Sequence, residues 1–391
     1  MKKILLFPFL ILSIWTITFG QDRVMTAFPE QGEFITSDLE RFWEAVENMD
    51  TEPKSFEAYL AQGSIGLKSF IPGRIINADS LSSKVRERKN DYLPFKDFHF
   101  EREELVSHYH SLKKLYPYAQ FPPVYFVMGR FSSGGTSNDV GLIIGVEMLT
   151  DVDLSFLVIH ECIHFQQNRS KRDHSLLEKS IIEGSADFIA ELITGSLGNQ
   201  KMYDYCEANE ELILQQFSKE MLKNDYGDWL YNTDLESRPA NMGYWVGYKI
   251  YESIYHKAKD KKLAINRMLN NTDYLSLLSE SEILEKYMRP MVIGLQPFAN
   301  HSNNVDFNLT ELEIGFSHPM QGSSFRPIRE EGVLFPLEDI IGYDETHTKF
   351  SLTIKLEPNT EYAFIVSGRG FRNEFAYPIE EYEVRFTTKK E

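Results

Sequence analysis

Cysteine is scarce in this sequence: only Cys162 and Cys206 occur among its 391 residues. A disulfide-rich scaffold is therefore excluded, and at most one bridge can form. Export would permit that bridge, but Cys162 falls within a strongly apolar segment and the sequence does not place Cys206 beside it. We favour two small buried thiols, because unpaired cysteine is commonly buried.

Positive charge is also in short supply. Lys and Arg number 41 against 58 Asp and Glu, so the formal net charge is −17 at pH 7. A surface this acidic repels phosphate backbones, which argues against a nucleic-acid partner. Low-complexity runs and internal repeats are missing, and 42% of the residues are hydrophobic. The composition therefore predicts a folded chain of two or three domains.

Long apolar runs are missing everywhere except at the start of the chain. Residues 1–20 read MKKILLFPFLILSIWTITFG, with a basic start, an apolar stretch, and small Thr18 and Gly20 at the −3 and −1 positions of a cleavage site. This is typical of a secretory signal peptide. The alternative is an uncleaved membrane anchor, but the run contains Pro8 and is shorter than the roughly 20 apolar residues that span a bilayer. We therefore predict an exported protein, periplasmic or secreted, with no membrane span after cleavage.

The spacing of apolar residues predicts a mainly helical domain with a small sheet over residues 21–300. Helices are predicted at 34–49, 55–63, 100–117, over most of 153–224, and at 242–258. Strands are predicted at 123–131 and 140–149, on either side of a Gly-rich loop at 132–139.

The pattern of apolar and polar residues changes near residue 290. Residues 290–308 contain Pro, Gly and four Asn, which predicts a linker. Beyond it, four segments alternate apolar and polar residues between turns, at 309–317, 349–356, 361–368 and 381–388. We predict a small β-sandwich over 306–391, and hence an α+β fold: a helical domain followed by an all-β domain.

The segment VIHECIHFQQN, residues 158–168, contains the pattern H-E-x-x-H. On a helix, His160 and His164 lie one turn apart on the same face, so both imidazoles can reach one zinc ion. Glu161 is offset from that face, but it is close enough to take a proton from a water bound to the ion. The alternative is three polar residues that fall in this order by chance.

A catalytic zinc site normally takes a third protein ligand, and KSIIEGSADFIAEL supplies Glu183. The 18 residues between His164 and Glu183 allow a turn and the start of a second, antiparallel helix. Small Gly184 and Ala186 favour close helix packing, so a carboxylate there is expected to be buried and to need a partner. Asp187 lies one turn further on, where it can hold the second ring nitrogen of His160. Surface positions for Glu183 and Asp187 are the alternative.

This spacing, H-E-x-x-H followed by Glu in EGSADF, resembles the gluzincin metallopeptidases. Similar patterns occur in bacterial predicted zinc-dependent proteases. MGYWVGYKI and LERFWEAV also resemble the gliding-motility lipoprotein B group. The resemblance covers about residues 36–290 and implies one Zn²⁺ held by His160, His164 and Glu183, with Glu161 as base.

The same resemblance implies a small sheet whose edge strand pairs with extended substrate, and residues 140–149 are the candidate strand. It also implies a downstream Tyr or His that stabilises the oxyanion. Tyr244 is our prediction, with Tyr248 and His256 as alternatives. GVEML lacks the letter order of the G-x-M-E-N segment that binds a free amino terminus, which speaks against aminopeptidase specificity. The segment 306–391 resembles bacterial Ig-like domains, which serve as spacers or bind envelope partners.

Two functions remain open from the sequence. The first is an exported zinc metallopeptidase acting on peptides or proteins, with Glu161 as general base. The second is a non-catalytic cell-envelope scaffold, of gliding or secretion machinery, that keeps a zincin fold. A glycosidase is disfavoured because no carboxylate pair of that kind is recognisable.

Overall fold

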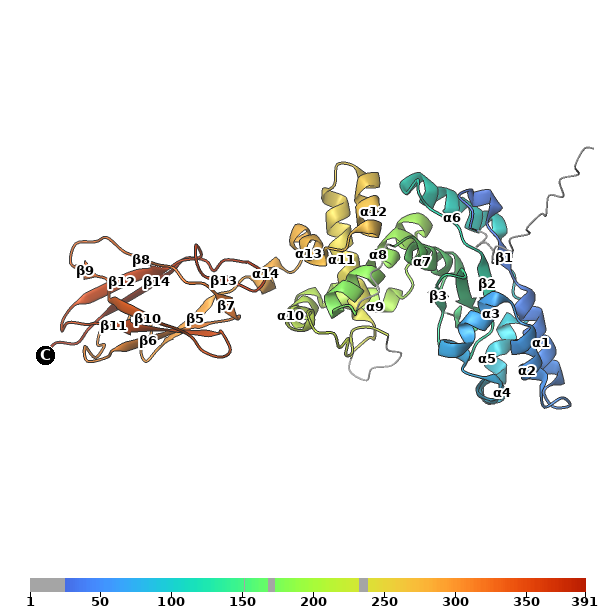
Figure 1. Cartoon of the computed structure of the whole chain (residues 1–391), viewed down its shortest axis with the longest axis horizontal. Helices are drawn as coiled ribbons and strands as arrows, with labels where there is room; N and C mark the ends of the chain where they lie inside the picture. Colours follow the sequence, from blue (N-terminus) through green and yellow to red (C-terminus); the bar gives the residue numbers. More distant parts are fainter. Residues whose placement is uncertain (1–24, 151, 168–172, 232–237) are drawn as a thin grey trace, which may run out of the picture. The chain divides into compact units, whose positions relative to one another are not determined.

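The computed structural model describes residues 25–150, 152–167, 173–231 and 238–391 (Figure 1). The predicted signal peptide lies outside these residues. In the described part the fold is α+β, with 14 α-helices before residue 289 and most strands after it, as predicted. None of the described helices has the length and apolar character needed to cross a membrane.

The helices are α1 (Ser37–Asn48), α2 (Ser55–Gln62), α3 (Ile65–Phe70), α4 (Ala78–Glu87), α5 (Lys89–Tyr92), α6 (Arg102–Leu115), α7 (Leu154–Gln166), α8 (Leu176–Thr194), α9 (Gln200–Ala208), α10 (Glu210–Glu220), α11 (Met242–Lys257), α12 (Lys261–Asn270), α13 (Tyr274–Ser281) and α14 (Glu285–Met288). A π-helical turn, η2 (Ile71–Ile75), follows α3, and a 3-10 turn, η4 (Val146–Met148), follows β4. The predicted helices at 34–49, 55–63, 100–117 and 242–258 are confirmed as α1, α2, α6 and α11.

The chain forms two compact units. The first contains α1–α7, α12 and a four-stranded sheet, and the second contains α9–α11, α13, α14 and the later strands. Helix α8 contributes its residues up to Gly184 to the second unit and those from Ser185 onward to the first.

The sheet of the first unit has the order β1-β2-β4-β3, with β1 (Phe34–Ile35), β2 (Val124–Val127), β3 (Gly135–Ser137) and β4 (Leu142–Gly145). Strands β1, β2 and β4 are parallel, and β3 runs antiparallel to β4. Every residue of β2 and β4 is buried. Helix α7 packs on β3 and β4, while α1 and α3 pack on β2. The side chain of Asp153 caps α7 by accepting from the N–H of Phe156.

Two predictions about this sheet are wrong. The segment 132–139, predicted as a loop, contains β3. The segment 140–149, predicted as the substrate-pairing edge strand, contains β4, which lies between β2 and β3. Strand β3 is polar and Gly-rich, so its sequence has no apolar alternation, and it becomes a strand by pairing with β4.

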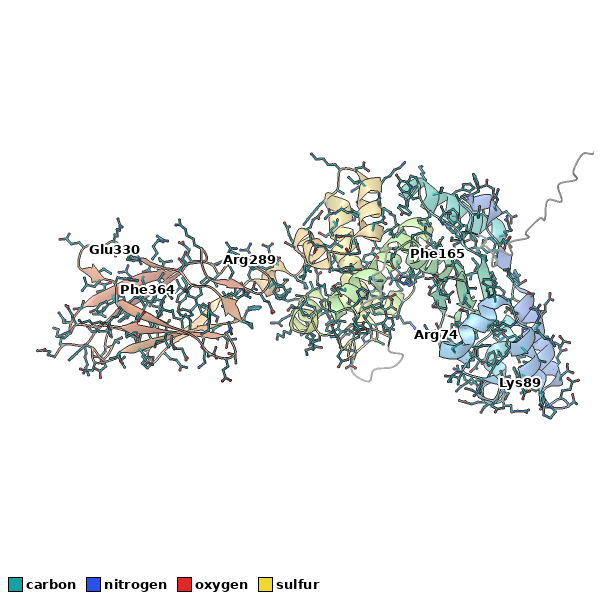
Figure 2. All side chains as sticks on the ribbon, in the orientation of Figure 1. Arg74, Lys89, Phe165, Arg289, Glu330 and Phe364 are labelled. Carbon is teal, nitrogen blue, oxygen red and sulfur yellow. The ribbon has the colours of Figure 1, made fainter. Side chains whose placement is uncertain are left out.

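In the second unit, the strands after residue 291 are β5 (Val292–Gln296), β6 (Glu311–Phe316), β7 (Met320–Gln321), β8 (Phe325–Pro327), β9 (Val333–Leu334), β10 (Leu337–Tyr343), β11 (Lys349–Ile354), β12 (Glu361–Val366), β13 (Arg372–Asn373) and β14 (Tyr382–Thr387). One sheet has the order β10-β11-β6-β5 and another the order β14-β12-β8. Apolar side chains of both sheets form one buried core, which includes Phe364 (Figure 2). The four predicted strands are confirmed as β6, β11, β12 and β14.

The predicted linker at 290–308 is wrong in part, because it contains β5. This strand pairs with β6, with Gly294 opposite Gly315. Only Leu295 of β5 is buried, although its sequence VIGLQ is largely apolar. The likeness of this region to Ig-like domains, and the domain limits 21–300 and 306–391, stay predictions.

Both cysteines are free and buried, as we favoured from the sequence. Burial raises the pKa of each thiol to about 12. Thiolate nucleophiles need a lowered pKa, so neither residue is suited to nucleophilic catalysis.

Candidate metal centre

Helix α7 presents two histidines toward one point. His160 and His164 are one helical turn apart, and their ring centroids are 4.6 Å apart with the rings nearly perpendicular. Both side chains are buried, in a helix that is apolar over most of its surface. Buried imidazoles on such a helix need polar partners.

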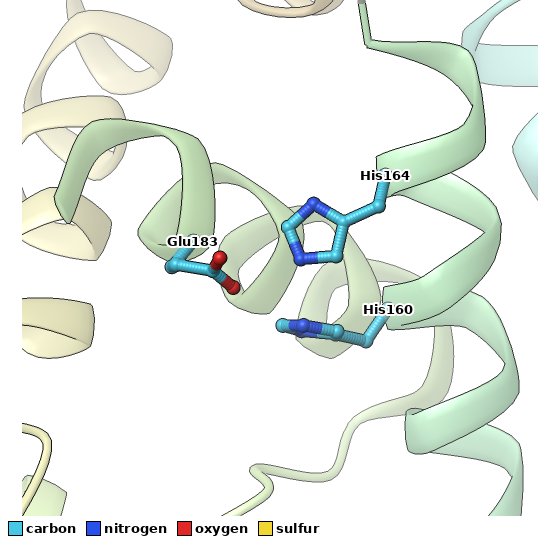
Figure 3. Close-up of side chains that lie close together, drawn as sticks. All are labelled: His160, His164 and Glu183. Atoms are coloured by element: carbon cyan, nitrogen blue, oxygen red, sulfur yellow. The ribbon is translucent and has the colours of Figure 1, made fainter. Parts of the chain in front are cut away.

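Helix α8 supplies a carboxylate to the same point (Figure 3). One potential ligand atom from each of His160, His164 and Glu183 lies within 4.8 Å of the others. Glu183 is only 6% exposed, so it is not the solvent-facing helix carboxylate that was the alternative. Among the described residues, this is the only group of three or more His, Cys, Asp or Glu side chains positioned to hold a metal ion.

Close contact between two helices sets the backbone position of Glu183. A Cβ atom added to Gly184 would lie 2.1 Å from the backbone nitrogen of Tyr248 in α11. A Cβ on Gly247 would lie 1.7 Å from the carbonyl oxygen of Ser180 in α8. Only glycine permits this approach, in which the two backbones touch directly. Gly184 therefore permits the close helix packing that the sequence indicated.

The Nδ1 atoms of both histidines face partners other than the cluster. His160 Nδ1 lies 2.8 Å from Oδ1 of Asp187, which is 5% exposed. His164 Nδ1 lies 2.8 Å from Oε1 of Gln167, and Gln167 Nε2 donates to Ser185 Oγ at 2.8 Å. With Nδ1 protonated and held in this way, Nε2 of each ring is left with its lone pair for a metal.

Gln167 and Ser185 were missed from the sequence. Gln167 is the first residue beyond α7, three positions after His164, and its side chain turns back toward that ring. Little in the sequence indicated this role, because a Gln that follows a helix is common and usually faces solvent. A small polar residue in the otherwise apolar stretch around Glu183 was the clue for Ser185, which is almost fully buried.

Tyr231 was also missed. Its hydroxyl donates a hydrogen bond to Oε1 of Glu183 at 2.7 Å, although half of the side chain is exposed. Its φ of 63° places it in the left-handed region, where a tyrosine is strained. Strain of this kind is often retained at functional sites. No periodicity or motif in the sequence distinguishes Tyr231 from the other tyrosines.

The predicted Tyr244 lies beside Tyr231. Their ring centroids are 6.4 Å apart, with the rings edge to face. The alternative Tyr248 is buried, and its ring packs edge to face against Tyr203. The other alternative, His256, stacks edge to face on Tyr255 near the end of α11. The role of Tyr244 stays a prediction.

Glu161 lies against the edge strand of the sheet. A Cβ atom added to Gly135 of β3 would lie 2.7 Å from Oε1 of Glu161 and 2.8 Å from its Cγ. The Glu161 side chain is 6% exposed. Strand β3 therefore brings its backbone into direct contact with this carboxylate, and no larger residue fits at Gly135 without moving it.

The residues of the cluster fit a divalent metal ion. Two imidazoles and one carboxylate are a common ligand set of catalytic zinc sites. The charge of Glu183 and the oriented Nε2 atoms suit a cation, while the partner of each ligand restricts its movement. The arrangement can therefore bind a metal ion.

Comparisons with known proteins agree with a metal site of this kind. Residues 123–272 match the model of a family described as predicted Zn-dependent protease (DUF2268). This segment is less than half of the chain, but it contains every residue of the cluster. No curated protein matches the sequence.

Solved structures add little. CopC from Methylosinus trichosporium OB3b is 14% identical over 26% of this chain and 95% of its own, with a TM-score of 0.22. Surface layer protein SbsC, domains 1–6, is 13% identical over 91% of this chain, with a TM-score of 0.23, and this chain spans 45% of that structure. With TM-scores this low, these likenesses support no conclusion about fold or function.

Proposed function

We propose that this chain is an exported zinc metallopeptidase that hydrolyses peptide bonds. The observation that carries the proposal is the convergence of His160, His164 and Glu183 in a buried cluster, while Glu161, which follows His160 on α7, is buried as well. The description of the matched family as Zn-dependent and as a protease supports the same conclusion.

In this proposal His160, His164 and Glu183 hold the zinc ion. When bound, zinc supplies Lewis acidity, which polarises the scissile carbonyl and makes water acidic enough to lose a proton near neutral pH. Glu161 takes that proton from the attacking water and passes it to the leaving amine. The enclosed position of Glu161, against β3, keeps its carboxylate aimed at one place.

The remaining polar residues orient these groups. Asp187 and Gln167 fix the rings of His160 and His164, and the hydrogen bond from Tyr231 to Oε1 of Glu183 restricts the movement of that carboxylate, which would hold the metal. Tyr244 is proposed to stabilise the oxyanion that develops on the substrate.

The substrate is proposed to be an extended peptide that pairs with β3. This strand is an edge of the sheet, and β4 has a strand on both sides. Pairing with β3 would bring a peptide backbone past Gly135 and therefore past the Glu161 carboxylate. Export through the residues 1–20, and binding of an envelope partner by the C-terminal sandwich, are parts of the proposal that rest on sequence alone.

The metal content of the purified mature protein tests the proposal. We expect about one zinc ion per chain, with a high-affinity chelator abolishing cleavage of an unfolded protein such as casein and added zinc restoring it. Less than about a tenth of an equivalent of zinc would rule out the proposal. Stoichiometric zinc without cleavage of any peptide library would instead favour the scaffold function.

Replacing Gly135 with Ala is expected to impair catalysis without loss of zinc. The new methyl group would displace the Glu161 carboxylate, whose free end can move at little cost to folding. A shift of about 1 Å in a catalytic group can reduce kcat/KM by roughly 100-fold. Peptidase assays and metal analysis of the variant would measure both effects.

Gly134→Ala is the matched control for this variant. A Cβ at Gly134 would lie 3.6 Å from the side chain of Leu157, which is an ordinary van der Waals contact. We expect near-normal activity from it. Equal activity of the two variants would show that the contact between Gly135 and Glu161 does not matter.

A further inference from the structure

Glu147 is a buried carboxylate that has no part in the proposed mechanism. Glu147, in η4 directly after β4, is 1% exposed. In the described part of the chain no Lys, Arg or His forms a salt bridge with it. Isolated buried charges are costly, so a carboxylate retained here needs a compensating role.

Backbone N–H groups are the partners of Glu147. Its Oε2 accepts from the N–H of Gly129 at 2.9 Å, and its Oε1 accepts from the N–H of Phe131 at 3.2 Å. Both donors belong to residues 128–134, which connect β2 to β3; we call this segment the β2–β3 connection. A Cβ at Gly129 would lie 2.7 Å from Glu147 Oε1, so the backbone lies directly on the carboxylate.

The same connection is held by buried hydroxyl groups. Tyr59 donates to the carbonyl oxygen of Met128 at 3.1 Å, and Tyr92 donates to that of Gly129 at 2.9 Å. On its outer side, Arg130 and Ser132 both donate to the carbonyl oxygen of Arg74 (labelled in Figure 2).

Phe131 is the strained point of the connection. Its φ is 59°, and its ring is covered by the Arg88 guanidinium at 3.8 Å. A left-handed phenylalanine persists only where its surroundings hold it in place, and the N–H of this residue is bound by Glu147.

We propose that Glu147 is a positioning residue that holds the β2–β3 connection so that β3 keeps Gly135 against the Glu161 carboxylate. The inference deepens the proposed function, since β3 is the strand to which substrate is proposed to bind. Without both acceptors, the buried N–H group of Gly129 and the partly buried N–H group of Phe131 would lose their partners, which favours opening of the connection.

The ionisation of Glu147 gives this role a signature in pH. Burial raises the pKa of Glu147 from 4.5 to about 7, and the backbone hydrogen bonds oppose the rise. The titratable neighbours are Tyr59 on α2 and Tyr92 on α5, and burial raises the pKa of both hydroxyl groups well above the usual 10. The charged side chains of Arg88 and Arg130 face Tyr92. Glu147 is therefore the group of this set that titrates near neutral pH.

The sign of the effect follows from linkage. In the closed connection, where Glu147 is buried on the N–H groups of Gly129 and Phe131, this carboxyl group binds its proton more tightly than it does when the connection opens to water. Protonation of Glu147 therefore stabilises the closed form relative to the open form. Between about pH 4.5 and about pH 7, each pH unit therefore raises the opening constant of the connection by up to about tenfold, and above pH 7 the effect levels off.

Hydrogen exchange followed by mass spectrometry tests this inference on the intact protein. After correction for the intrinsic exchange rate, we expect peptides covering residues 128–137 to open more readily as the pH rises from about 5 to about 7. Glu147→Gln should remove this pH dependence, because the amide does not titrate. Glu147→Ala should increase opening at every pH by about tenfold or more, because both acceptors are lost.

Glu40→Gln, at an exposed position of α1, is the control and should behave as the wild type. The inference would be overturned if residues 128–137 of the wild type and of Glu147→Gln showed the same pH dependence, or if Glu147→Ala left their exchange unchanged. Exchange does not require peptidase activity, so this result is separate from the test of the proposed function. In the peptidase assay, Glu147→Ala should raise KM several-fold while the zinc content stays at the wild-type level.

Discussion

A Glu161→Gln variant is expected to lose peptide hydrolysis and keep its zinc. Gln has nearly the same shape, so it can occupy the space beside Gly135, but its amide cannot take a proton from water. Removing a general base costs roughly 10²- to 10⁴-fold in kcat. Casein cleavage and the zinc content of the same preparation measure the two halves of this prediction.

Comparison with Glu183→Gln makes this prediction more specific. Glu183 belongs to the cluster, so its replacement should reduce zinc affinity as well as activity. Glu103→Gln, at an exposed position of α6, should change neither property. Full activity of Glu161→Gln would remove Glu161 from the mechanism. Loss of zinc in that variant would mean that Glu161 supports the metal instead of the proton transfer.

The helix-borne part of the site could be predicted from the sequence because it depends on local geometry. His160 and His164 are four residues apart, as are Glu183 and Asp187, and the helix alone places each pair on one face. The surroundings of these residues also carried information, because Gly184 next to Glu183 indicated the close contact with α11.

The strand-borne part could not be predicted in the same way. Gly135–Ser137 is a strand because β4 provides hydrogen-bond partners for it. A polar segment of three residues has no alternation of apolar and polar residues from which such pairing could be predicted. The choice of 140–149 as the edge strand failed for a related reason. Apolar composition shows that a strand is buried, but it does not show which strand lies outermost.

Tyr231 and Gln167 illustrate a third limit. Both reach the cluster from residues outside regular helices, so their positions depend on the path of the chain after a helix or before one. Chain direction at such places is set by tertiary contacts. The sequence contains many other Tyr and Gln residues, and nothing in it shows which of them lie near the metal ligands. The polar partners of a metal ligand are therefore harder to predict than the ligands themselves.

Replacing Gly247 with Ala is expected to have the largest effect on stability among single-methyl changes near the site. The added Cβ would lie 1.7 Å from the carbonyl oxygen of Ser180 and 2.4 Å from its carbonyl carbon. These are backbone atoms within α8, so the clash can be relieved only by moving the two helices apart. Overpacking normally costs about 1–3 kcal/mol, and a backbone clash this close should lie at or above the upper end of that range.

The same displacement should weaken zinc binding, because Glu183 lies on α8 next to Gly184, which touches α11 in the same contact. Gly294→Ala is the control, since a Cβ there has no atom within 4 Å, and it should change stability by less than about 0.5 kcal/mol. Calorimetry of both variants and competition with a chelator would measure the unfolding midpoint and the zinc affinity. If Gly247→Ala lowered neither quantity, the direct backbone contact between α8 and α11 could not be what sets the position of the third ligand.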